Sequence, residues 1–393
     1  MVYLEVGEDQ VCRVDAHLLG EAAALRLHQQ YHHLLEVVFP NPLHPRHYLL
    51  RSRGWAGQLD LDGLTIELRP KIPLANLFAM VEQAYGLEGL AFLPGTGATS
   101  SLPQVFAALA SLLARRVEAR FHQGLYREYR EQQEEVAWVR GRVLFPPGRR
   151  PSALRCAFQE HRADTADNQI LAGTLQHLRS VAFADPRVQR QIQRAHRLLA
   201  GGGVLVRRVR PEECVGRFYH RLNRDYALLH GLCRFFLEHR GPALGAGDYP
   251  MVPFAVYLPT LFERFAAHWL ARHLPASLHL DAQYRAPLEG SEGLAFRIDL
   301  VLRAGQRGPV LAVIDTKYKA ANEVTSEDLQ QVVAYAVRLG TAQAFLVYPS
   351  TLTARRRIRV GGVQVETLCF ALDGHLERAG EGVLSALSRL KYA

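Results

Sequence analysis

The sequence predicts a mixed α+β protein with three parts: a small β-rich N-terminal domain, a mainly helical middle region and a C-terminal α/β domain. Three observations support this prediction. Apolar residues alternate around a tight-turn sequence near the N-terminus, they recur at helical spacing from about residue 101, and helical and strand-like runs alternate from about residue 249. We place the parts at residues 1–95, 96–245 and 246–393, which are ordinary domain sizes.

The first part contains a predicted hairpin. Apolar residues alternate through 57–61 and 64–69, on either side of Asp62-Gly63, a dipeptide that is typical of tight turns. A helix from about Leu74 to Leu87 should follow, and the run from Pro94 to Gly97 is typical of a linker.

The middle part begins with one long apolar stripe at helical spacing, formed by Val105, Leu109, Leu112, Leu113, Val117 and Phe121. Further along, we expect a hairpin arm near residues 138–145. The run from Gly201 to Gly203 should end a helix, and another helix is predicted from about Gly216 to His239.

The last part should form a mixed sheet flanked by helices. Two β-rich runs, 296–303 and 310–316, are separated by a turn-like segment and therefore predict a hairpin. The other predicted elements are helices at 260–273 and 326–339 and a buried strand at 344–348.

Composition narrows the functional class. Hydrophobic residues make up 48% of the chain and charged residues 22%, the balance of a folded globular protein. No apolar run reaches the length of about 18 residues that a membrane-spanning helix needs. No basic leader precedes an apolar segment either, so we expect a cytoplasmic protein. The five cysteines form no CxxC pair, which argues against a zinc site or a disulfide framework.

The net charge of +9 favours a polyanionic partner such as nucleic acid. The arginines that follow the last predicted strand, Arg355, Arg356 and Arg357, are candidate DNA contacts. Their alternative interpretation is a solvated run of charges.

The clearest chemical signal comes from Asp299, Asp315 and Lys317. Asp299 lies within one predicted strand, and Asp315 and Lys317 lie at the end of the next. Period-two alternation puts Asp315 and Lys317 on one face, and a suitable hairpin register brings Asp299 beside them. Both acids lie in apolar runs, where a carboxylate is costly unless it is paired or bound to a metal. A surface ion pair at a strand end is the alternative.

Two carboxylates and an ammonium suit phosphodiester hydrolysis. A hard cation such as Mg²⁺, bound by Asp299 and Asp315, activates water and offsets charge on the phosphate. Lys317 then holds or deprotonates the attacking water and stabilises the developing charge.

The flanking helices offer supporting residues. Glu263 lies near the start of the preceding helix, and Gln331 and Tyr335 are four residues apart on the following one, so they share a face. These residues could hold the substrate phosphate or Lys317 in position. The alternative is that they belong to ordinary amphipathic helices.

These residues resemble the PD-(D/E)XK restriction-endonuclease-like fold, and most closely the McrC family, the nuclease subunits of McrBC-type modified-cytosine restriction systems. The resemblance spans nearly the whole chain, and Ile298 stands where the fold has its proline. It implies metal binding by Asp299 and Asp315, catalysis by Lys317, and support from Glu263 and Gln331. The motifs that carry it, in the family's order, are Ile66–Ile72, Arg140-Gly-Arg142, Asp164–Asn168, Leu261-Phe-Glu263 and Ile314–Lys319.

The sequence contains no Walker phosphate loop, G-x-x-x-x-G-K-[ST]. The resemblance implies instead a separate AAA+ GTPase, McrB, whose ring is engaged by the N-terminal domain and by Arg140 and Arg142. Ordinary β structure with surface arginines is the alternative for these segments. Lys319 and Tyr335 are further expected DNA contacts. For Lys319, the alternative interpretation is a solvated charge.

The sequence therefore predicts a Mg²⁺-dependent endonuclease subunit of a McrBC-like antiviral restriction complex, cutting double-stranded DNA when a GTPase ring engages it. Mn²⁺ is an alternative cofactor. Two other functions stay open at this point: a non-cleaving subunit that activates a ring NTPase, and a stand-alone RecB-like nuclease.

Overall fold

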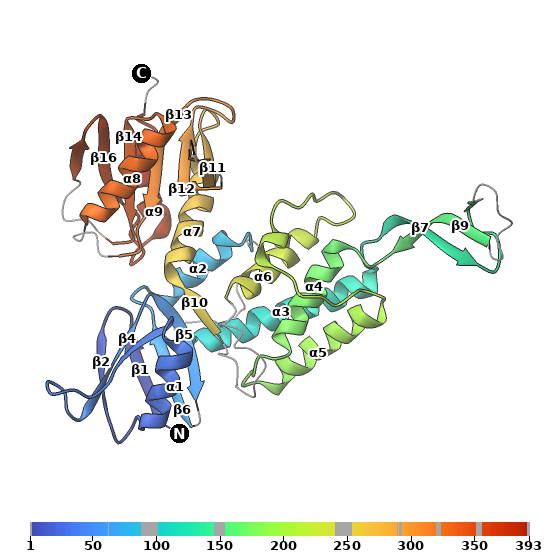
Figure 1. The fold of residues 1–393 in the computed structure, drawn as a ribbon, viewed down its shortest axis with the longest axis horizontal. Helices are drawn as coiled ribbons and strands as arrows, with labels where there is room; N and C mark the ends of the chain where they lie inside the picture. The colour runs from blue at the N-terminus through green and yellow to red at the C-terminus, as the bar shows by residue number, and fades with distance from the viewer. Residues whose placement is uncertain are drawn as a thin grey trace. The chain divides into compact units, whose positions relative to one another are not determined.

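The structure is a computed structural model that describes residues 2–61, 63–87, 101–144, 154–239, 254–288, 290, 293–319, 324–350 and 356–390. Its residues group into two compact units. The first joins Met1–Phe92 with Ala255–Ala393, and the second is Leu93–Phe254. Strands and helices occur in both units, which confirms the mixed α+β class (Figure 1). Within these ranges, no helix is both long and apolar enough to cross a membrane.

The predicted N-terminal hairpin is confirmed: β5 (Trp55–Leu61) pairs antiparallel with β6 (Leu64–Arg69), and Gly63 supplies the positive φ of 86° at the turn. The strand order of this sheet is β1-β6-β5-β10, so strands that are far apart in the sequence build it. The flanking strands are β1 (Val2–Gly7) and β10 (Phe254–Tyr257).

The rest of the N-terminal segment forms a second small sheet and two helices. The sheet has the order β2-β4-β3. Its strands are β2 (Val11–Asp15), β3 (Leu35–Val38) and β4 (His47–Ser52), and the helices are α1 (Glu21–Tyr31) and α2 (Leu74–Ala84). The helix expected over 74–87 thus ends three residues early, at Ala84.

The C-terminal segment holds a mixed sheet in the order β11-β12-β13-β14-β16-β15. The predicted hairpin is confirmed as β12 paired antiparallel with β13, and β13 pairs parallel with β14. Strands β11, β15 and β16 and helix α9 were not predicted. The bounds are β11 (His279–Pro287), β12 (Ala295–Arg303), β13 (Val310–Thr316), β14 (Gln343–Tyr348), β15 (Arg357–Val360), β16 (Val363–Cys369), α7 (Leu258–His273), α8 (Ser326–Leu339) and α9 (Leu376–Leu387).

Helix α8 connects the parallel strands β13 and β14, as a crossover helix does. Its start is fixed by a capping box in which Thr325 accepts from the Asp328 amide and Asp328 accepts from the Thr325 amide. Gly340, with a φ of 68°, ends it. Val332 of α8 packs in the same core as Val313 of β13. The crossover therefore brings the first turn of α8 next to the end of β13.

The second unit combines helices with a β arm that projects from them (Figure 1). In the arm, β7 and β9 pair antiparallel over nine residues each, and β8 pairs with β9. The arm is much longer than the expected 138–145 segment, whose described residues, 138–144, belong to it. The bounds are α3 (Leu102–Gln123), β7 (Glu128–Val136), β8 (Arg142–Val143), β9 (Leu154–Arg162), α4 (Ala166–Leu178), α5 (Pro186–Gly201) and α6 (Tyr226–Glu238).

Two helix boundaries in this unit test the sequence predictions. The glycine run at 201–203 does end α5, as expected. The helix expected from Gly216 begins only at Tyr226, so that prediction was wrong by ten residues. Gly216 has a φ of 70°, which breaks a helix, and Arg217 and Asn223 are held by Asp167 of α4. These tertiary contacts hold the segment in a non-helical conformation that ends in turns.

Candidate active site

The hairpin register brings the two candidate metal-binding aspartates together. The outermost paired residues of β12 and β13 are Leu300 and Ile314, and Asp299 and Asp315 are the next residues outward. Beyond that pair the Asp299 side chain bridges the strands: its Oδ2 accepts hydrogen bonds from the Thr316 amide and the Thr316 hydroxyl, each at 2.8 Å. Both carboxylates therefore lie at the same end of the hairpin.

Asp315 is nearly enclosed, with 2% of its surface exposed. Its Oδ2 lies 2.7 Å from the Lys317 ammonium, and within the described part of the chain no donor is aligned on that oxygen for a hydrogen bond. Burial and the neighbouring charge of Asp299 raise the pKa of Asp315 to about 6, although Lys317 acts in the opposite direction. A buried carboxylate that already attracts a cationic side chain is suited to bind a cation.

Lys317 is held in place from three sides. Its backbone amide donates to the carbonyl of Val347 on β14 at 2.8 Å, and its ammonium donates to Gln331 Oε1 at 2.8 Å. The Gln331 amide in turn donates to the Tyr335 hydroxyl at 2.7 Å. Burial lowers the pKa of Lys317, but Asp315 and the other nearby acids outweigh it and raise the pKa overall. The side chain is therefore an ordered cation.

Asp328, in the first turn of α8, is a site residue that the sequence analysis did not select. It is 6% exposed, its Oδ1 lies 3.9 Å from the Lys317 ammonium, and it forms an ion pair with Lys319. Despite its burial, the hydrogen bonds from Lys319 and Thr325 lower the pKa of Asp328. The only signal in the sequence was an acid three residues after a helix cap.

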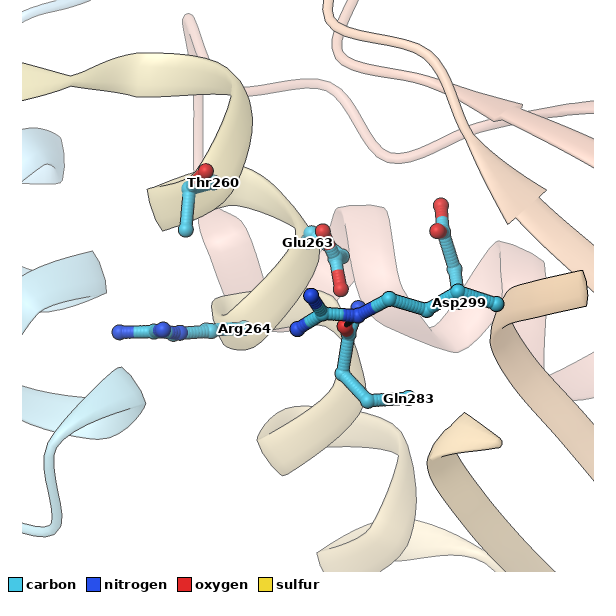
Figure 2. Close-up of a pocket in the computed structure, with 6 residues that line it drawn as sticks. Thr260, Glu263, Arg264, Gln283 and Asp299 are labelled. Atoms are coloured by element: carbon cyan, nitrogen blue, oxygen red, sulfur yellow. Dashed lines mark hydrogen bonds between the residues drawn. The ribbon is translucent and has the colours of Figure 1, made fainter. Parts of the chain in front are cut away.

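A pocket of about 270 Å³ opens beside Asp299. Its lining residues come from α7, β11 and β12: Thr260, Glu263, Arg264, Gln283, Arg297 and Asp299. Figure 2 shows Glu263 leaving α7 on the side of Asp299 and Gln283, whereas Arg264 points the other way. Burial, together with the charges of Asp299 and Asp315, raises the pKa of Glu263 to about 8, against the effect of Arg297. Glu263 thus adds a third acid to the site.

Two residues of this pocket were not predicted from the sequence. Arg297 lies two residues before Asp299 on β12 and donates through Nε to Gln283 Oε1. Gln283 has a φ of 53°, a conformation that non-glycine residues rarely adopt, and it is skipped in the ladder between β11 and β12. Strain of this kind concentrates at functional sites.

The other predicted DNA contacts have mixed positions. Lys319 is engaged by Asp328, and Tyr335 is 7% exposed behind Gln331. Arg357 lies on the edge strand β15, where its Nε donates to Glu366 at 3.3 Å, and Arg356 directly precedes that strand. Because β14 and β16 separate β15 from β13, these arginines are not brought to the acidic cluster. Arg355 lies outside the described residues, and all five DNA contacts stay predictions.

The predicted partner contacts lie on the arm of the second unit. Arg140 packs over the Phe158 ring at 4.1 Å and pairs with Glu160 at 3.6 Å, and Arg142 begins β8. Their role in binding a partner stays a prediction.

Among the described residues, no group of three or more histidine, cysteine, aspartate or glutamate side chains is arranged to bind a metal ion. The candidate donor set is instead Asp299 and Asp315, both supplying hard oxygens, and Asp315 Oδ2 is buried beside the Lys317 ammonium at 2.7 Å. Mg²⁺ keeps several waters and is commonly bound by one or two carboxylates plus substrate phosphates. The residues present therefore fit this ion.

The fold and the site define a mixed α/β protein with an acidic, lysine-containing centre at one end of a sheet. A family model described as "McrBC 5-methylcytosine restriction system component" matches residues 50–349. The chain belongs to this family, which confirms the predicted resemblance to McrBC-type restriction systems.

Solved structures from Thermococcus gammatolerans are similar to the chain. One is a chain of the refined half-complex from a tetradecameric assembly of McrB AAA+ hexamers with bound McrC, with a TM-score of 0.57 and 18% identity, covering 99% of this chain and 100% of that one. Another is a chain of the cryo-EM structure of the McrBC complex, with a TM-score of 0.44 and 18% identity, covering 69% and 88%. No curated protein matches.

Proposed function

We propose that the chain is the Mg²⁺-dependent DNA endonuclease subunit of a McrBC-like restriction complex that acts in antiviral defence. The observation that carries the proposal is the convergence of Asp299, Asp315 and Lys317 at one end of the β12–β13 hairpin. Family membership supports a restriction role, and the acidic cluster supports cleavage by this subunit. We further propose that the β11–β14 sheet with α7 and α8 is a PD-(D/E)XK core.

Asp299 and Asp315 would hold the metal. When bound, Mg²⁺ or Mn²⁺ would lower the pKa of a bound water and offset negative charge on the phosphate. Asp299 is oriented for this task by its two hydrogen bonds from Thr316, so it needs little rearrangement.

Lys317 supplies the positive charge that the protein itself brings to the reaction. Asp315 and Gln331 hold the ammonium, and Tyr335 holds Gln331. A cation fixed in this way stabilises charge that develops on the phosphate without paying for its own reorganisation. In the metal-free site, burial and the charges of Asp299 and Asp315 raise the pKa of Glu263 and so favour its protonated form.

The proposed partner is a McrB-like AAA+ GTPase ring, and the proposed substrate is double-stranded DNA. In the similar assembly from Thermococcus gammatolerans, McrC is bound to McrB hexamers. Two segments of this chain are proposed for the contact: the β5–β6 hairpin and the tip of the arm. The tip presents Trp138 and Val139, exposed by 73% and 61%, beside Arg140 and Arg142. Exposed aromatic and arginine side chains are typical of protein interfaces.

The test is a cleavage assay with the purified chain, Mg²⁺, and plasmid DNA with or without 5-methylcytosine, each with and without the partner ring and GTP. Cleavage that requires both the ring and GTP supports the proposal. Cleavage by the chain alone would favour a stand-alone nuclease. Stimulation of the GTPase without any cleavage would favour a non-cleaving activator.

A further inference from the structure

The segment from Asp164 to Asn168 has no part in the proposed cleavage site, yet its polar side chains are deeply enclosed. It lies in the second unit, between the end of β9 and the first turn of α4. Asp167 is 3% exposed and Asn168 is 0% exposed. Buried polar groups of this kind are retained only when their hydrogen bonds are satisfied, so their partners reveal what they hold.

The Asn168 amide holds both ends of the arm. Its Nδ2 donates to the carbonyl of Tyr126 at 2.8 Å and to the carbonyl of Ala163 at 2.6 Å. Tyr126 lies two residues before β7, where the chain enters the arm, and Ala163 directly follows β9, where it leaves. One side chain therefore joins the two strands at their root.

Tyr226, the first residue of α6, completes the root. Its hydroxyl donates to Asn168 Oδ1 at 2.5 Å and accepts from the Tyr126 amide at 3.1 Å. The Tyr126 amide and carbonyl are thus both bound, one by Tyr226 and one by Asn168. Tyr226 is itself fully buried, so the root is anchored in the helical core.

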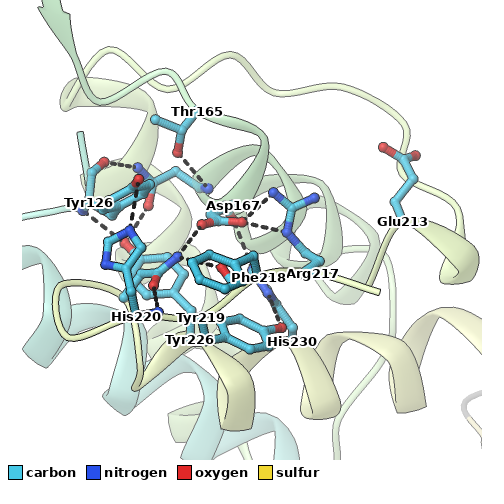
Figure 3. Close-up of polar contacts among 12 residues, drawn as sticks. Tyr126, Thr165, Asp167, Glu213, Arg217, Phe218, Tyr219, His220, Tyr226 and His230 are labelled. Atoms are coloured by element: carbon cyan, nitrogen blue, oxygen red, sulfur yellow. Dashed lines mark hydrogen bonds and ion pairs between the residues drawn. The ribbon is translucent and has the colours of Figure 1, made fainter. Parts of the chain in front are cut away.

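The neighbouring acid ties the same turn to the segment before α6 (Figure 3). Asp167 pairs with Arg217 and accepts from the Asn223 amide at 3.1 Å. His230 contacts the Asp167 carbonyl through Nε2 at 3.2 Å, and its Nδ1 lies 2.9 Å from the Tyr219 hydroxyl. A carbonyl can only accept, so Nε2 carries the proton and Nδ1 accepts from Tyr219. The turn that carries Asn168 is therefore itself fixed.

The arm has little else to set its direction. Seven of the nine residues of β7 are exposed or partly exposed polar side chains, and the other two are the exposed Tyr129 and the partly exposed Val136. The short strand β8 adds only two residues to the sheet, and among the described residues of its three strands the buried side chains are Cys156, Ala157 and Phe158 of β9, so the core of the arm is small. Packing along its length cannot orient it, so the contacts at the root must.

We propose that Asn168 is the positioning residue of the arm: by binding the Tyr126 and Ala163 carbonyls together, it fixes the direction in which the arm leaves the helices. In the complete complex this would present the Trp138–Arg142 tip to the ring in one orientation. That last step rests on the proposed function, whereas the fixed root does not. Preorganisation of a contact segment strengthens binding because less freedom is lost on association.

The test measures the direction of the arm in the full chain. Spin labels attached to a non-natural ketone amino acid at Val139, on the tip, and at Arg190, on α5, report a distance distribution without involving the native cysteines. Asn168→Ala should broaden this distribution and weaken binding to the McrB-like ring by about tenfold. The matched control is Thr174→Val, which removes a buried hydrogen bond to Ile170 on the same helix, at 2.8 Å, but does not contact the arm.

A second variant guards against loss of folding. Tyr226→Phe removes one hydroxyl from the root and leaves the ring in the core, so it should broaden the distribution less than Asn168→Ala. A distribution as narrow as that of the wild type in both variants would overturn the proposal. A broad distribution with unchanged ring binding would support the fixed root and count against the arm as the ring contact. Broadening with weaker ring binding would support both.

Discussion

Asp299 accepts two hydrogen bonds from Thr316, one from the backbone amide and one from the hydroxyl, both at 2.8 Å. This contact replaces the next rung of the β12–β13 ladder and fixes a carboxylate where the strands end. Asp315, directly across the hairpin, is buried, and its Oδ2 pairs with the Lys317 ammonium at 2.7 Å. The hairpin therefore presents two aspartates together before any ligand is bound.

Replacing either aspartate tests the metal assignment. Asp299→Ala and Asp315→Ala should each lower the cleavage rate by a factor on the order of 10³ or more, because a bound metal contributes several kcal/mol to the transition state. Isothermal titration should show loss of Mg²⁺ binding, with the circular dichroism spectrum unchanged. Asp281→Ala is the matched control, since Asp281 on β11 pairs with Arg303 at 2.6 Å. Wild-type cleavage by either site variant would contradict the assignment.

Lys317 should affect the reaction without affecting metal binding. Lys317→Ala removes a fixed cation, and by analogy with the loss of one transition-state donor the rate should fall by about 10²- to 10³-fold. Gln331→Ala, which removes only the support at 2.8 Å, should have a smaller effect. Titration of Mg²⁺ into both variants is the measurement. Because an ammonium is not a metal ligand, we expect both variants to bind Mg²⁺ with the affinity of the wild type. Loss of Mg²⁺ binding by Lys317→Ala would refute this division of roles.

Glu263 should make the stability of the metal-free protein depend on pH. Its folded-state pKa of about 8 lies above its ordinary value of 4.5. Between these two pH values, the folded state therefore holds a proton that the unfolded state has released. Its contribution to the free energy of unfolding is therefore lost as pH rises through that window. Calorimetry in EDTA should show a steeper decline for the wild type than for Glu263→Gln. Parallel curves for the two proteins would show that Glu263 titrates normally.

Arg297 is expected to contact a DNA phosphate, because it lines the Asp299 pocket and Gln283 holds it there. In buffer without divalent metal, Arg297→Ala should weaken DNA binding. It should also reduce the slope of log K against log salt concentration by about one. Fluorescence anisotropy at several salt concentrations measures both quantities. Arg307→Ala removes the same charge from the turn at the other end of the hairpin, and it should leave the slope unchanged. An equal effect of the two variants would point to general electrostatics instead.

The N-terminal segment should be needed for the stability of the C-terminal one. The Asn76 amide donates to the carbonyls of Leu372 and Gly374 at 2.7 and 2.8 Å, and the hydroxyl of Tyr318 donates to Glu8 at 3.2 Å. Asn76→Ala should lower the free energy of unfolding by about 1 kcal/mol, or a few degrees in Tm. Removal of residues 1–92 should cause a much larger loss. A truncated chain that melts like the wild type would contradict this prediction.

Local signals in the sequence were enough to define some elements completely. Helix α8 spans Ser326–Leu339 as predicted, because Thr325, Asp328 and Gly340 mark both of its ends. The common face of Asp315 and Lys317 followed from the period of a strand, and the structure places them 2.7 Å apart. Features that depend on residues adjacent in the sequence could thus be predicted from it.

Features that depend on distant residues were not. The start of α6 is set by Asp167 holding Arg217 and Asn223, about fifty residues away along the chain. The pairing of β10 with β5 leaves no trace in the local pattern of either strand. In the site, Asp328 and Arg297 are ordinary charged residues in sequence, and only the crossover and the hairpin bring them to the acidic centre.

The sheet that β10 completes also sets an order of events during synthesis. On the ribosome, β5 is made early, but its neighbour β10 (Phe254–Tyr257) emerges only after the whole arm and its helices have been translated. Until then β5 keeps an open edge, and an open strand edge is a site for wrong pairing and aggregation. The acidic centre is completed later still, so a nascent chain interrupted before β12 contains none of the residues of the proposed cleavage site, Asp299, Asp315 and Lys317.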